Sequence, residues 1–576
     1  MSDTLSTTQR DHALQALGDE EFDVLVIGGG VTGAGIALDA ASRGLRTAVV
    51  EAQDWSSGTS SRSSRLIHGG LRYLYNLDFK LVFEALTERA RLLTTIAPHL
   101  VEAQPFLWPL KTRAIERAYS AVGVGLYDAL SIVGARGKKV VPIQHHLSKK
   151  GALERFPEIK HDALIGAIEF HDARVDDARL VIQLIRTAVH YNAVAVSRAK
   201  VTELDKAQSG RITGATVTDL ETGETIKVRA KRVIAATGVW TEDTQDMAGG
   251  TGGLKVLASK GIHIVIPRER LKATSGMFLR TEKSVLFIIP WQHYWVIGTT
   301  DTAWHEQLKH PVPTSKDIDY VLEQANEILD KPLTRDDIIG TYAGLRPLLQ
   351  PKVLDESKST KVSREHTVTE VAPGMIAIAG GKYTTYRVMA EDAVDFSLGK
   401  AMAKKRPSVT AGLPLLGATG FEAMRNQSER LGAKYGFDAD RMHHLLRRYG
   451  SELTDLLASI DEDPTLGEPL AAAPQFIRAE VHRAAAVEGA LHLEDIFISR
   501  VRLNSESPDR GGSAVDEVAE IAAEVLGWDE ERTTQEKANY RARIAAELAA
   551  QEAPTDEEAS EVRMAADDIV GDDVLV

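Results

Sequence analysis

The segment from Asp23 to Glu51 constrains the fold of this chain more than any other. Residues 23–27 (Asp-Val-Leu-Val-Ile) form a short apolar run that is typical of a buried parallel strand. The pattern Gly-Gly-Gly-Val-Thr-Gly follows at 28–33, then an alanine-rich stretch to Ser42 and a second apolar run at 47–51. This order of strand, glycine-rich turn, helix and strand predicts a dinucleotide-binding unit.

Each glycine of the turn has its own physical role. Gly28 permits the tight turn, Gly30 lets the backbone approach a pyrophosphate, and Gly33 lets helix and strand pack closely. The pyrophosphate then lies on N–H groups at the positive end of the helix. Glu51 ends the second strand, where a carboxylate accepts hydrogen bonds from ribose hydroxyls. This unit by itself fits FAD and NAD equally.

Two later segments favour FAD. Residues 232–238 (Arg-Val-Ile-Ala-Ala-Thr-Gly) and 375–382 (Met-Ile-Ala-Ile-Ala-Gly-Gly-Lys) each read as a strand that runs into small residues. A chain that returns twice to one sheet is typical of two-domain flavoproteins, whereas a simple nicotinamide dehydrogenase completes its nucleotide domain contiguously. The alternative is that both segments are ordinary strand-to-helix turns.

Composition excludes several classes of function. With 576 residues, two or three domains are expected. The absence of cysteine removes disulfides, iron–sulfur clusters and cysteine nucleophiles, and fits a reducing cytoplasm. A formal net charge of −14 argues against nucleic-acid binding, so an anionic substrate requires a local cluster of cations. The polar residues 1–21 do not resemble a signal peptide, and no run of about 18 apolar residues predicts a membrane span.

Several motifs in order resemble the FAD-dependent glycerol-3-phosphate dehydrogenases. They include residues 27–44, 59–74 (Thr-Ser-Ser-Arg-Ser-Ser-Arg-Leu-Ile-His-Gly-Gly-Leu-Arg-Tyr-Leu) and 380–390 (Gly-Gly-Lys-Tyr-Thr-Thr-Tyr-Arg-Val-Met-Ala). The resemblance is close over roughly residues 21–400, and within that range three shorter motifs, at 260–265, 297–301 and 342–348, follow in the family's order. It implies that a membrane quinone oxidises the flavin and that sn-glycerol 3-phosphate becomes dihydroxyacetone phosphate.

The resemblance also implies the site residues. No metal site is predicted. The residues expected to bind FAD are Gly28, Gly30, Thr32, Gly33, Glu51, Thr59, Ser60, Ser61, Ser64, Leu66, His68, Gly69, Gly70, Val201, Ala236, Thr237, Gly238, Gly381, Lys382 and Thr384. For the substrate they are Arg72, Tyr73, His263, Arg346, Arg364, Lys382 and Thr384, of which His263, Arg346 and Lys382 are the expected catalytic residues.

Arginine and lysine suit this substrate because glycerol phosphate offers few handles beyond its dianionic head. Each of these basic residues also has an alternative role. Arg72 could be a surface residue, Arg346 a structural ion pair, and Arg364 part of an exposed polar strand, while Lys382 could face the flavin N1–C2 edge.

His263 is the leading candidate for the base that takes the hydroxyl proton. It alternates with Ile262, Ile264 and Ile266, so on a regular strand its ring points away from those aliphatic side chains. The alternative is a hydrogen-bonded edge histidine. His68 competes for the role, but its place in the cofactor segment predicts flavin contact.

The predicted fold class is α/β with an α+β substrate domain. A discontinuous Rossmann-like FAD-binding domain (21–100, 171–255 and 340–399) is expected beside an antiparallel-sheet substrate domain (101–170 and 256–339). A helical cap (400–551) and a mobile acidic tail (552–576) complete the chain. A homodimer is expected.

One apolar segment, 118–135, has Arg113 and Arg117 before it and Arg136, Lys138 and Lys139 after it. It predicts either a helix buried between domains or attachment to the inner face of the cell membrane. Three alternatives to the quinone-linked enzyme stay open: an oxidase on the same substrate, an amine-oxidising relative and a non-catalytic flavin-binding scaffold.

Overall fold

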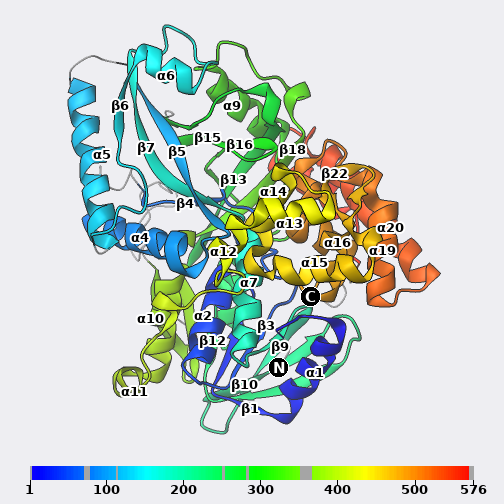
Figure 1. The fold of residues 1–576 in the computed structure, drawn as a ribbon. Helices are drawn as coiled ribbons and strands as arrows, with labels where there is room; N and C mark the ends of the chain where they lie inside the picture. Colours follow the sequence, from blue (N-terminus) through cyan, green and yellow to red (C-terminus); the bar gives the residue numbers. More distant parts are fainter. Residues whose placement is uncertain are drawn as a thin grey trace.

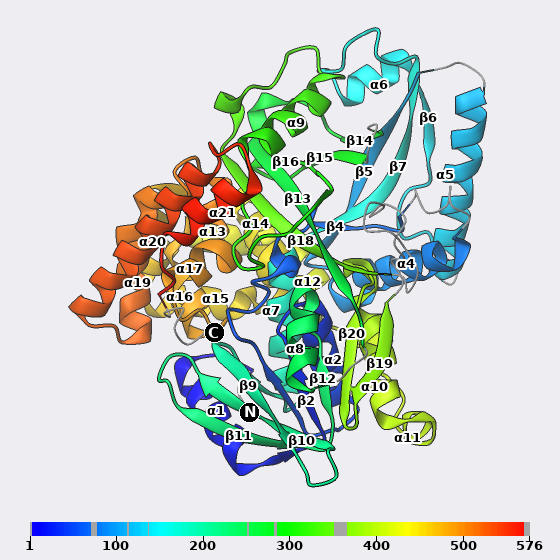
Figure 2. The same cartoon turned by 180° about the vertical axis from the view of Figure 1, so that it is seen from behind.

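A computed structural model describes residues 3–70, 78–111, 115–135, 137–249, 253–280, 285–350 and 366–569, without the side chains of 115–122. Figures 1 and 2 show a nucleotide-binding sheet at the bottom, a larger sheet above it, and C-terminal helices packed against one side of both. The N-terminus lies beside the lower sheet. This arrangement confirms the predicted α/β class with a separate antiparallel sheet and a helical C-terminal part.

The lower sheet is the predicted dinucleotide-binding unit. Its strands lie in the order β19 (Thr367–Ala372), β20 (Met375–Ala379), β12 (Val233–Ala235), β2 (Val24–Ile27), β3 (Thr47–Val50) and β8 (Val194–Val196). β12 is parallel to both β2 and β20, so the two later segments return to the first strand as predicted. Only β19 runs antiparallel, at the edge.

Both faces of this sheet are covered, which explains why its strands are apolar throughout. Val24 and Val26 of β2 pack in one core with helices α2 (Val31–Ser42), α7 (Asp177–His190) and α10 (Tyr386–Leu398). Leu25 and Ile27 point to the other face, where a four-stranded sheet and α1 (Thr7–Asp19) cover them. That sheet has the order β1 (Glu21–Phe22), β11 (Thr225–Ala230), β10 (Ile212–Asp219) and β9 (Ala199–Lys206).

The upper sheet has ten strands and is antiparallel except where β14 pairs with β5. Its longest strand, β13 (Val256–Pro267), lies next to one edge and pairs with β16, β17 and β18. The other bounds are β4 (Leu66–Ile67), β5 (Val101–Leu110), β6 (His145–Ser148), β7 (Gly166–Val175), β14 (Gly276–Arg280), β15 (Val285–Pro290), β16 (Tyr294–Gly298), β17 (Thr302–Ala303) and β18 (Gly340–Leu349). Helices α4 (Phe79–Arg91), α5 (Ile115–Gly134), α6 (Lys149–Arg155) and α9 (Ser315–Asn326) accompany it.

The strand β18 differs from its predicted assignment. The sequence places residues 340–399 with the cofactor domain, but Gly340–Leu349 pairs with β13 at ten successive positions, from Val265 to Val256. By hydrogen bonding, β18 therefore belongs to the upper sheet. Its far end still reaches the lower sheet's ligand edge, because Pro347 and Leu348 line the large cavity there.

The C-terminal helices form two hydrophobic cores of their own. The helices are α12 (Phe421–Asn426), α13 (Ser428–Tyr435), α14 (Ala439–Tyr449), α15 (Leu453–Glu462), α16 (Arg478–Ala486), α17 (Leu493–Asp495), α18 (Leu503–Glu506), α19 (Val515–Leu526) and α20 (Glu530–Ala550), with a hairpin of β21 (Pro469–Leu470) and β22 (Ala473–Ile477), whereas α11 (Lys400–Lys405) packs on α10. We call this part the helical cap. Buried ion pairs join it to α7, for example Arg179 to Glu488 at 2.7 Å.

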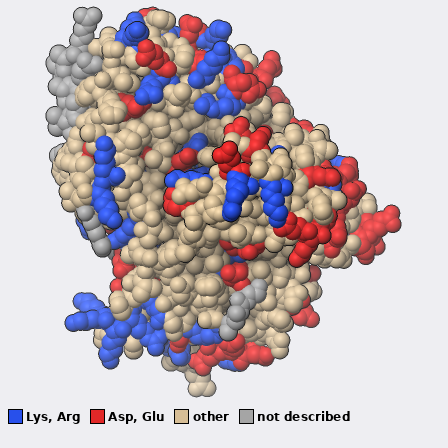
Figure 3. Space-filling view, viewed as in Figure 1, with Lys and Arg blue, Asp and Glu red and all other residues tan. Residues whose placement is uncertain are grey.

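The sequence predicts a mobile acidic tail from residue 552, but this prediction is wrong for residues 552–569. It forms α21 (Asp556–Met564), and Asp556 pairs with the buried Lys260. Beyond the helix, Asp568 pairs with His310 at 2.8 Å. Acidic composition predicted disorder, but basic partners elsewhere in the fold neutralise these carboxylates. In Figure 3, acidic side chains gather over α19 and α20, whereas lysine and arginine gather over α11.

His99 lies fully buried where the helical cap meets the cofactor domain. A Cβ on Gly417 or Gly450 would come within 2.9 Å of its ring, and the ring centroid of Phe421 is 6.1 Å away. Among the described residues, neither ring nitrogen has a hydrogen-bond partner. Burial, aided by Arg447, lowers the pKa of His99 to about 3.

Acidification is therefore expected to destabilise the fold through His99. The pKa of this ring is near 6.5 in the unfolded chain but only about 3 in the folded chain. Above pH 6.5 the ring is neutral in both states, and protonation of His99 does not lower the free energy of unfolding. Each pH unit below 6.5 lowers the free energy of unfolding by about 1.4 kcal/mol until the folded pKa is reached. Urea unfolding at pH 7 and pH 5 should show a smaller loss in His99→Leu than in the parent. The exposed His161→Leu serves as control, and equal losses in all three proteins would contradict this reading.

Candidate active site

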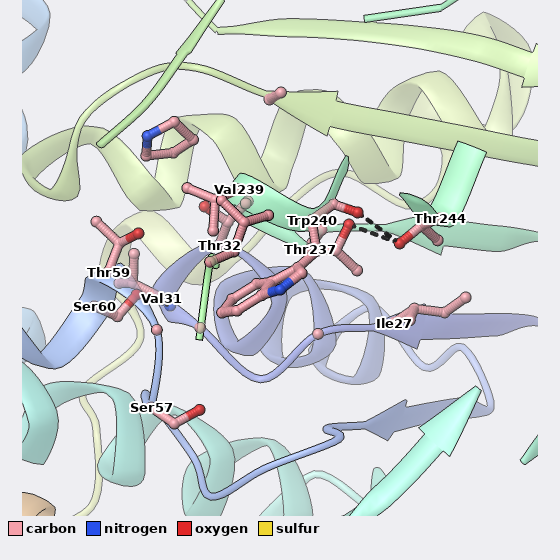
Figure 4. Close-up of a pocket in the computed structure, with 18 of the residues that line it drawn as sticks. Ile27, Val31, Thr32, Ser57, Thr59, Ser60, Thr237, Val239, Trp240 and Thr244 are labelled. Atoms are coloured by element: carbon pink, nitrogen blue, oxygen red, sulfur yellow. Dashed lines mark hydrogen bonds between the residues drawn. The ribbon is translucent and has the colours of Figure 1, made fainter. Parts of the chain in front are cut away.

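A cavity of about 870 Å³ runs along the carboxyl ends of the strands of the lower sheet. Such an edge is where ligands bind in open parallel sheets. The turn after β2, the loop 57–63, the segment 236–247 and the ends of β18 and β20 supply most of its wall. Figure 4 shows Val31 and Thr32 at the start of α2, near Thr59 and Ser60 of the loop.

The glycines of the turn leave space that any side chain would fill. Gly28 has a φ of +108°, and a Cβ there would lie 2.6 Å from the Ala236 carbonyl oxygen. A Cβ on Gly33 would lie 1.8 Å from the Gly28 carbonyl oxygen. Ser60 accepts a hydrogen bond from the Val31 N–H at 2.9 Å, beside Gly30. The cradle that a pyrophosphate requires is therefore present.

Glu51, the predicted ribose-binding residue, is held in place by its neighbours. Its two carboxylate oxygens accept hydrogen bonds from the backbone N–H groups of Gly29 and Gln53, at 2.6 Å and 2.8 Å. Burial raises the pKa of Glu51, against the lowering effect of these hydrogen bonds. The carboxylate is thus fixed before a ligand arrives, as recognition of ribose hydroxyls requires.

Thirteen of the predicted cofactor residues line this cavity and seven do not. The thirteen are Gly28, Gly30, Thr32, Glu51, Thr59, Ser60, His68, Val201, Ala236, Thr237, Gly238, Gly381 and Lys382. The seven outside the lining are Gly33, Ser61, Ser64, Leu66, Gly69, Gly70 and Thr384. Ser61 lines a second, smaller cavity. Thr384 bridges to His68, whose N–H and carbonyl it bonds at 3.1 and 3.2 Å.

Sequence reasoning missed part of the wall. Trp240 and Thr244 follow the predicted Ala-Thr-Gly strand and line the cavity, with Thr244 donating to Thr237 Oγ1 at 3.1 Å (Figure 4). Their closeness to Thr237 in sequence was the available signal. Met564 of α21 also lines the cavity, and no local pattern could have indicated it.

Two predicted catalytic cations line this cavity. They are Arg346 and Lys382, and His68 lines it too. Arg346 donates to Thr299 Oγ1 at 2.9 Å and to the Thr300 carbonyl at 3.1 Å, and pairs with Asp301 at 3.4 Å. A Cβ on Gly261 would come 2.4 Å from the Arg346 guanidinium, so this glycine leaves the space that the arginine occupies.

His263 does not line the cavity and is 2% exposed. Strand register places Gly298 on one side of it and Tyr342 on the other. Its ring stacks on Tyr342 with centroids 4.8 Å apart, and its Nε2 is 2.8 Å from the Ser64 hydroxyl. Ile262, Ile264 and Ile266 pack together in the core on the opposite face, as the alternation predicts.

The environment keeps His263 neutral. Burial lowers its pKa well below 6.5, and the positive charges of Arg346 and Arg65 add to the effect. A neutral imidazole can accept a proton, which suits the predicted role. Arg72, Tyr73 and Arg364 lie outside the described residues, so their predicted contacts stay predictions.

Comparisons with known proteins agree with this geometry. The family model "FAD dependent oxidoreductase" matches residues 23–387, and "C-terminal domain of alpha-glycerophosphate oxidase" matches 408–533. Glycerol-3-phosphate dehydrogenase 2 of Mycobacterium tuberculosis is 50% identical over 98% of this chain and 94% of the relative. The human mitochondrial glycerol-3-phosphate dehydrogenase is 37% identical over 88% of this chain and 71% of that protein.

A solved structure is similar in fold over almost the whole chain. The glycerol-3-phosphate dehydrogenase from Bacillus halodurans, complexed with FAD, has a TM-score of 0.75 and 29% identity, covering 94% of this chain and 98% of that one. Its cofactor agrees with the glycine cradle and the fixed Glu51. The chain is an FAD-dependent oxidoreductase and belongs to the glycerol-3-phosphate dehydrogenase family.

Proposed function

We propose that this enzyme oxidises the C2 alcohol of sn-glycerol 3-phosphate to dihydroxyacetone phosphate. The observation that carries the proposal is that Arg346 and Lys382 line the cofactor cavity and that the buried, neutral His263 lies within the electrostatic reach of Arg346. Cations there suit a dianionic head group, and a buried neutral histidine suits an alcohol that must lose a proton. The names of the relatives support the same substrate.

Gly28, Gly30 and Glu51 would hold FAD, which would supply the hydride acceptor. Arg346 and Lys382 would bind the phosphate and orient C2. His263 would take the hydroxyl proton, with its ring held by Ser64 and Tyr342. Because Arg346 is one of the charges that lower the pKa of His263, a dianion on Arg346 would make His263 more basic when substrate arrives.

We also propose a quinone of the cell membrane as the electron acceptor, with attachment to its inner face. None of the described helices is long and apolar enough to cross a bilayer. Phe79 and Phe83 on α4, and Leu126 and Val133 on α5, are exposed apolar side chains on two packed helices. Of the flanking cations, Arg113 and Arg136 lie outside the described residues, as does the side chain of Arg117. The homodimer stays a prediction.

Glycerol 3-phosphate is expected to bleach the flavin absorbance of the anaerobic holoenzyme. Arg346→Leu should raise the half-saturating concentration at least about tenfold, because a charged hydrogen-bonding group contributes roughly 1.5–3 kcal/mol. Arg335→Leu, which removes a partly exposed surface ion pair, is the matched control. Absence of bleaching in the parent would refute the dehydrogenase and favour a flavin-binding scaffold.

Reoxidation of the bleached enzyme separates the acceptors. The quinone proposal expects slow reoxidation by oxygen, faster reoxidation by a soluble quinone, and further acceleration when quinone is in anionic vesicles. Rapid oxygen consumption with peroxide formation would instead identify the oxidase, and vesicles without effect would remove the membrane surface from the proposal.

A further inference from the structure

A second cavity of about 50 Å³ lies between β18, the loop 61–65 and the helices α20 and α21. It shares no lining residue with the cofactor cavity. Six arginines line it but only one carboxylate, Glu547, does so. The arginines are Arg62, Arg65, Arg502, Arg510, Arg543 and Arg563.

Three of these arginines have a carboxylate close by. Arg65 lies 3.6 Å from Glu506, and Arg502 lies 2.9 Å from Asp177. Arg543 pairs with Glu494 and also lies 2.9 Å from Glu547. Each of these three arginines therefore has a nearby charge of opposite sign.

The other three arginines lack a carboxylate of their own. Arg563 is 1% exposed and lies 3.9 Å from Glu547, which already pairs with Arg543. Within the described chain, no acceptor is found for its Nε and Nη2 atoms. Arg510 donates hydrogen bonds to Asn504 and Thr341, and no carboxylate of the described residues lies within 4 Å of its guanidinium.

Arg62 completes this positively charged wall. In the part of the chain that the structure describes, no hydrogen bond or ion pair of its guanidinium is found. Burial lowers the pKa of Arg62 to about 10, and the nearby charges of Arg543 and Arg563 contribute to that lowering. Unpaired cations this close together destabilise the fold unless a mobile anion lies among them.

We propose that this cavity binds a small tetrahedral oxyanion of the phosphate class. Its volume holds about four water-sized groups, which matches the oxygens of one phosphate. The free N–H groups of Arg563 would donate to those oxygens, and guanidinium groups suit phosphate in a bidentate way. The ligand is therefore inorganic phosphate or a small phosphate monoester.

The bound anion would also stabilise the loop 61–65, whose Ser64 contacts the proposed base His263. Arg65 lies over the Tyr342 ring, 5.3 Å from its centroid, and Tyr342 stacks on His263. Tyr342 donates to the Ser63 carbonyl at 3.0 Å. Both cavity walls, the loop and β18, thus touch the residues that position His263.

The test is the melting temperature of the holoenzyme against phosphate concentration, with chloride holding the ionic strength constant. It uses an Arg346→Leu background, because phosphate also suits the substrate pocket. We expect a saturable rise of about 2 °C or more. Methyl phosphate in a parallel titration shows whether the site accepts monoesters, and a rise with either anion supports it.

Two variants locate the effect. Arg62→Gln should abolish the rise and, because it removes an unpaired charge, should not lower the melting temperature without phosphate. Arg563→Gln should also abolish the rise. Arg541→Gln, which changes an exposed arginine on the cavity-lining helix α20, should keep it. No saturable rise in the Arg346→Leu enzyme, or a rise that survives both cavity variants, would overturn the site.

Discussion

Replacing His263 with asparagine is expected to slow anaerobic flavin reduction by glycerol 3-phosphate about 10²–10⁴-fold, the usual contribution of a positioned general base. Asparagine keeps a polar group near the Ser64 hydroxyl but cannot take a proton. His263 does not line the cofactor cavity, so the variant should retain its FAD. The rate constant for chemistry should therefore fall while cofactor content stays constant.

Stopped-flow absorbance at saturating substrate measures this rate directly. His161→Asn, an exposed histidine, controls for general effects of the substitution. His68→Asn distinguishes the competing assignment, because His68 lines the cofactor cavity and its loss should change flavin binding more than proton transfer. Unchanged reduction rates in His263→Asn at every pH would remove this residue from the mechanism.

Features with a local signature were predictable from sequence. The strands at Val24, Val233 and Met375 were recognisable because each is apolar and runs into small residues, and the structure pairs all three in parallel. The orientation of His263 followed from simple alternation with Ile262 and Ile264. In both cases the relevant physics acts over a few neighbouring residues.

Contacts between distant segments had no such signature. Tyr342 stacks on His263 because β18 pairs with β13 in one particular register, which sequence spacing does not reveal. The acidic segment at Asp556 looked mobile because its partner, Lys260, is almost 300 residues away. Likewise Ser61 was assigned to the cofactor from the resemblance of residues 59–74 to a family segment, but it lines the second cavity.

Gly33→Ala is expected to yield protein without bound FAD, although Gly33 does not line the cofactor cavity. The new Cβ would lie 1.8 Å from the Gly28 carbonyl oxygen and 2.9 Å from its carbon. Both are backbone atoms, so no flexible side chain can move aside. Helix α2 must therefore shift away from β2. The shift moves the N–H groups of its first turn, which are expected to bind the pyrophosphate, away from Glu51, which is expected to bind the ribose. Overpacking of this kind typically costs about 1–3 kcal/mol, and the upper end, expected where both clashing atoms are backbone, is about 100-fold in FAD affinity.

The ratio of flavin to protein absorbance after purification and dialysis measures this loss. Gly412→Ala is the control, because a Cβ there meets nothing within 4 Å, and it should retain one FAD per chain. If Gly33→Ala also retained one FAD per chain, the close packing of α2 on β2 would not set cofactor affinity, and the cradle would depend on Gly28 and Gly30 instead. The experiment therefore separates contact with the cofactor from the backbone packing that shapes its site.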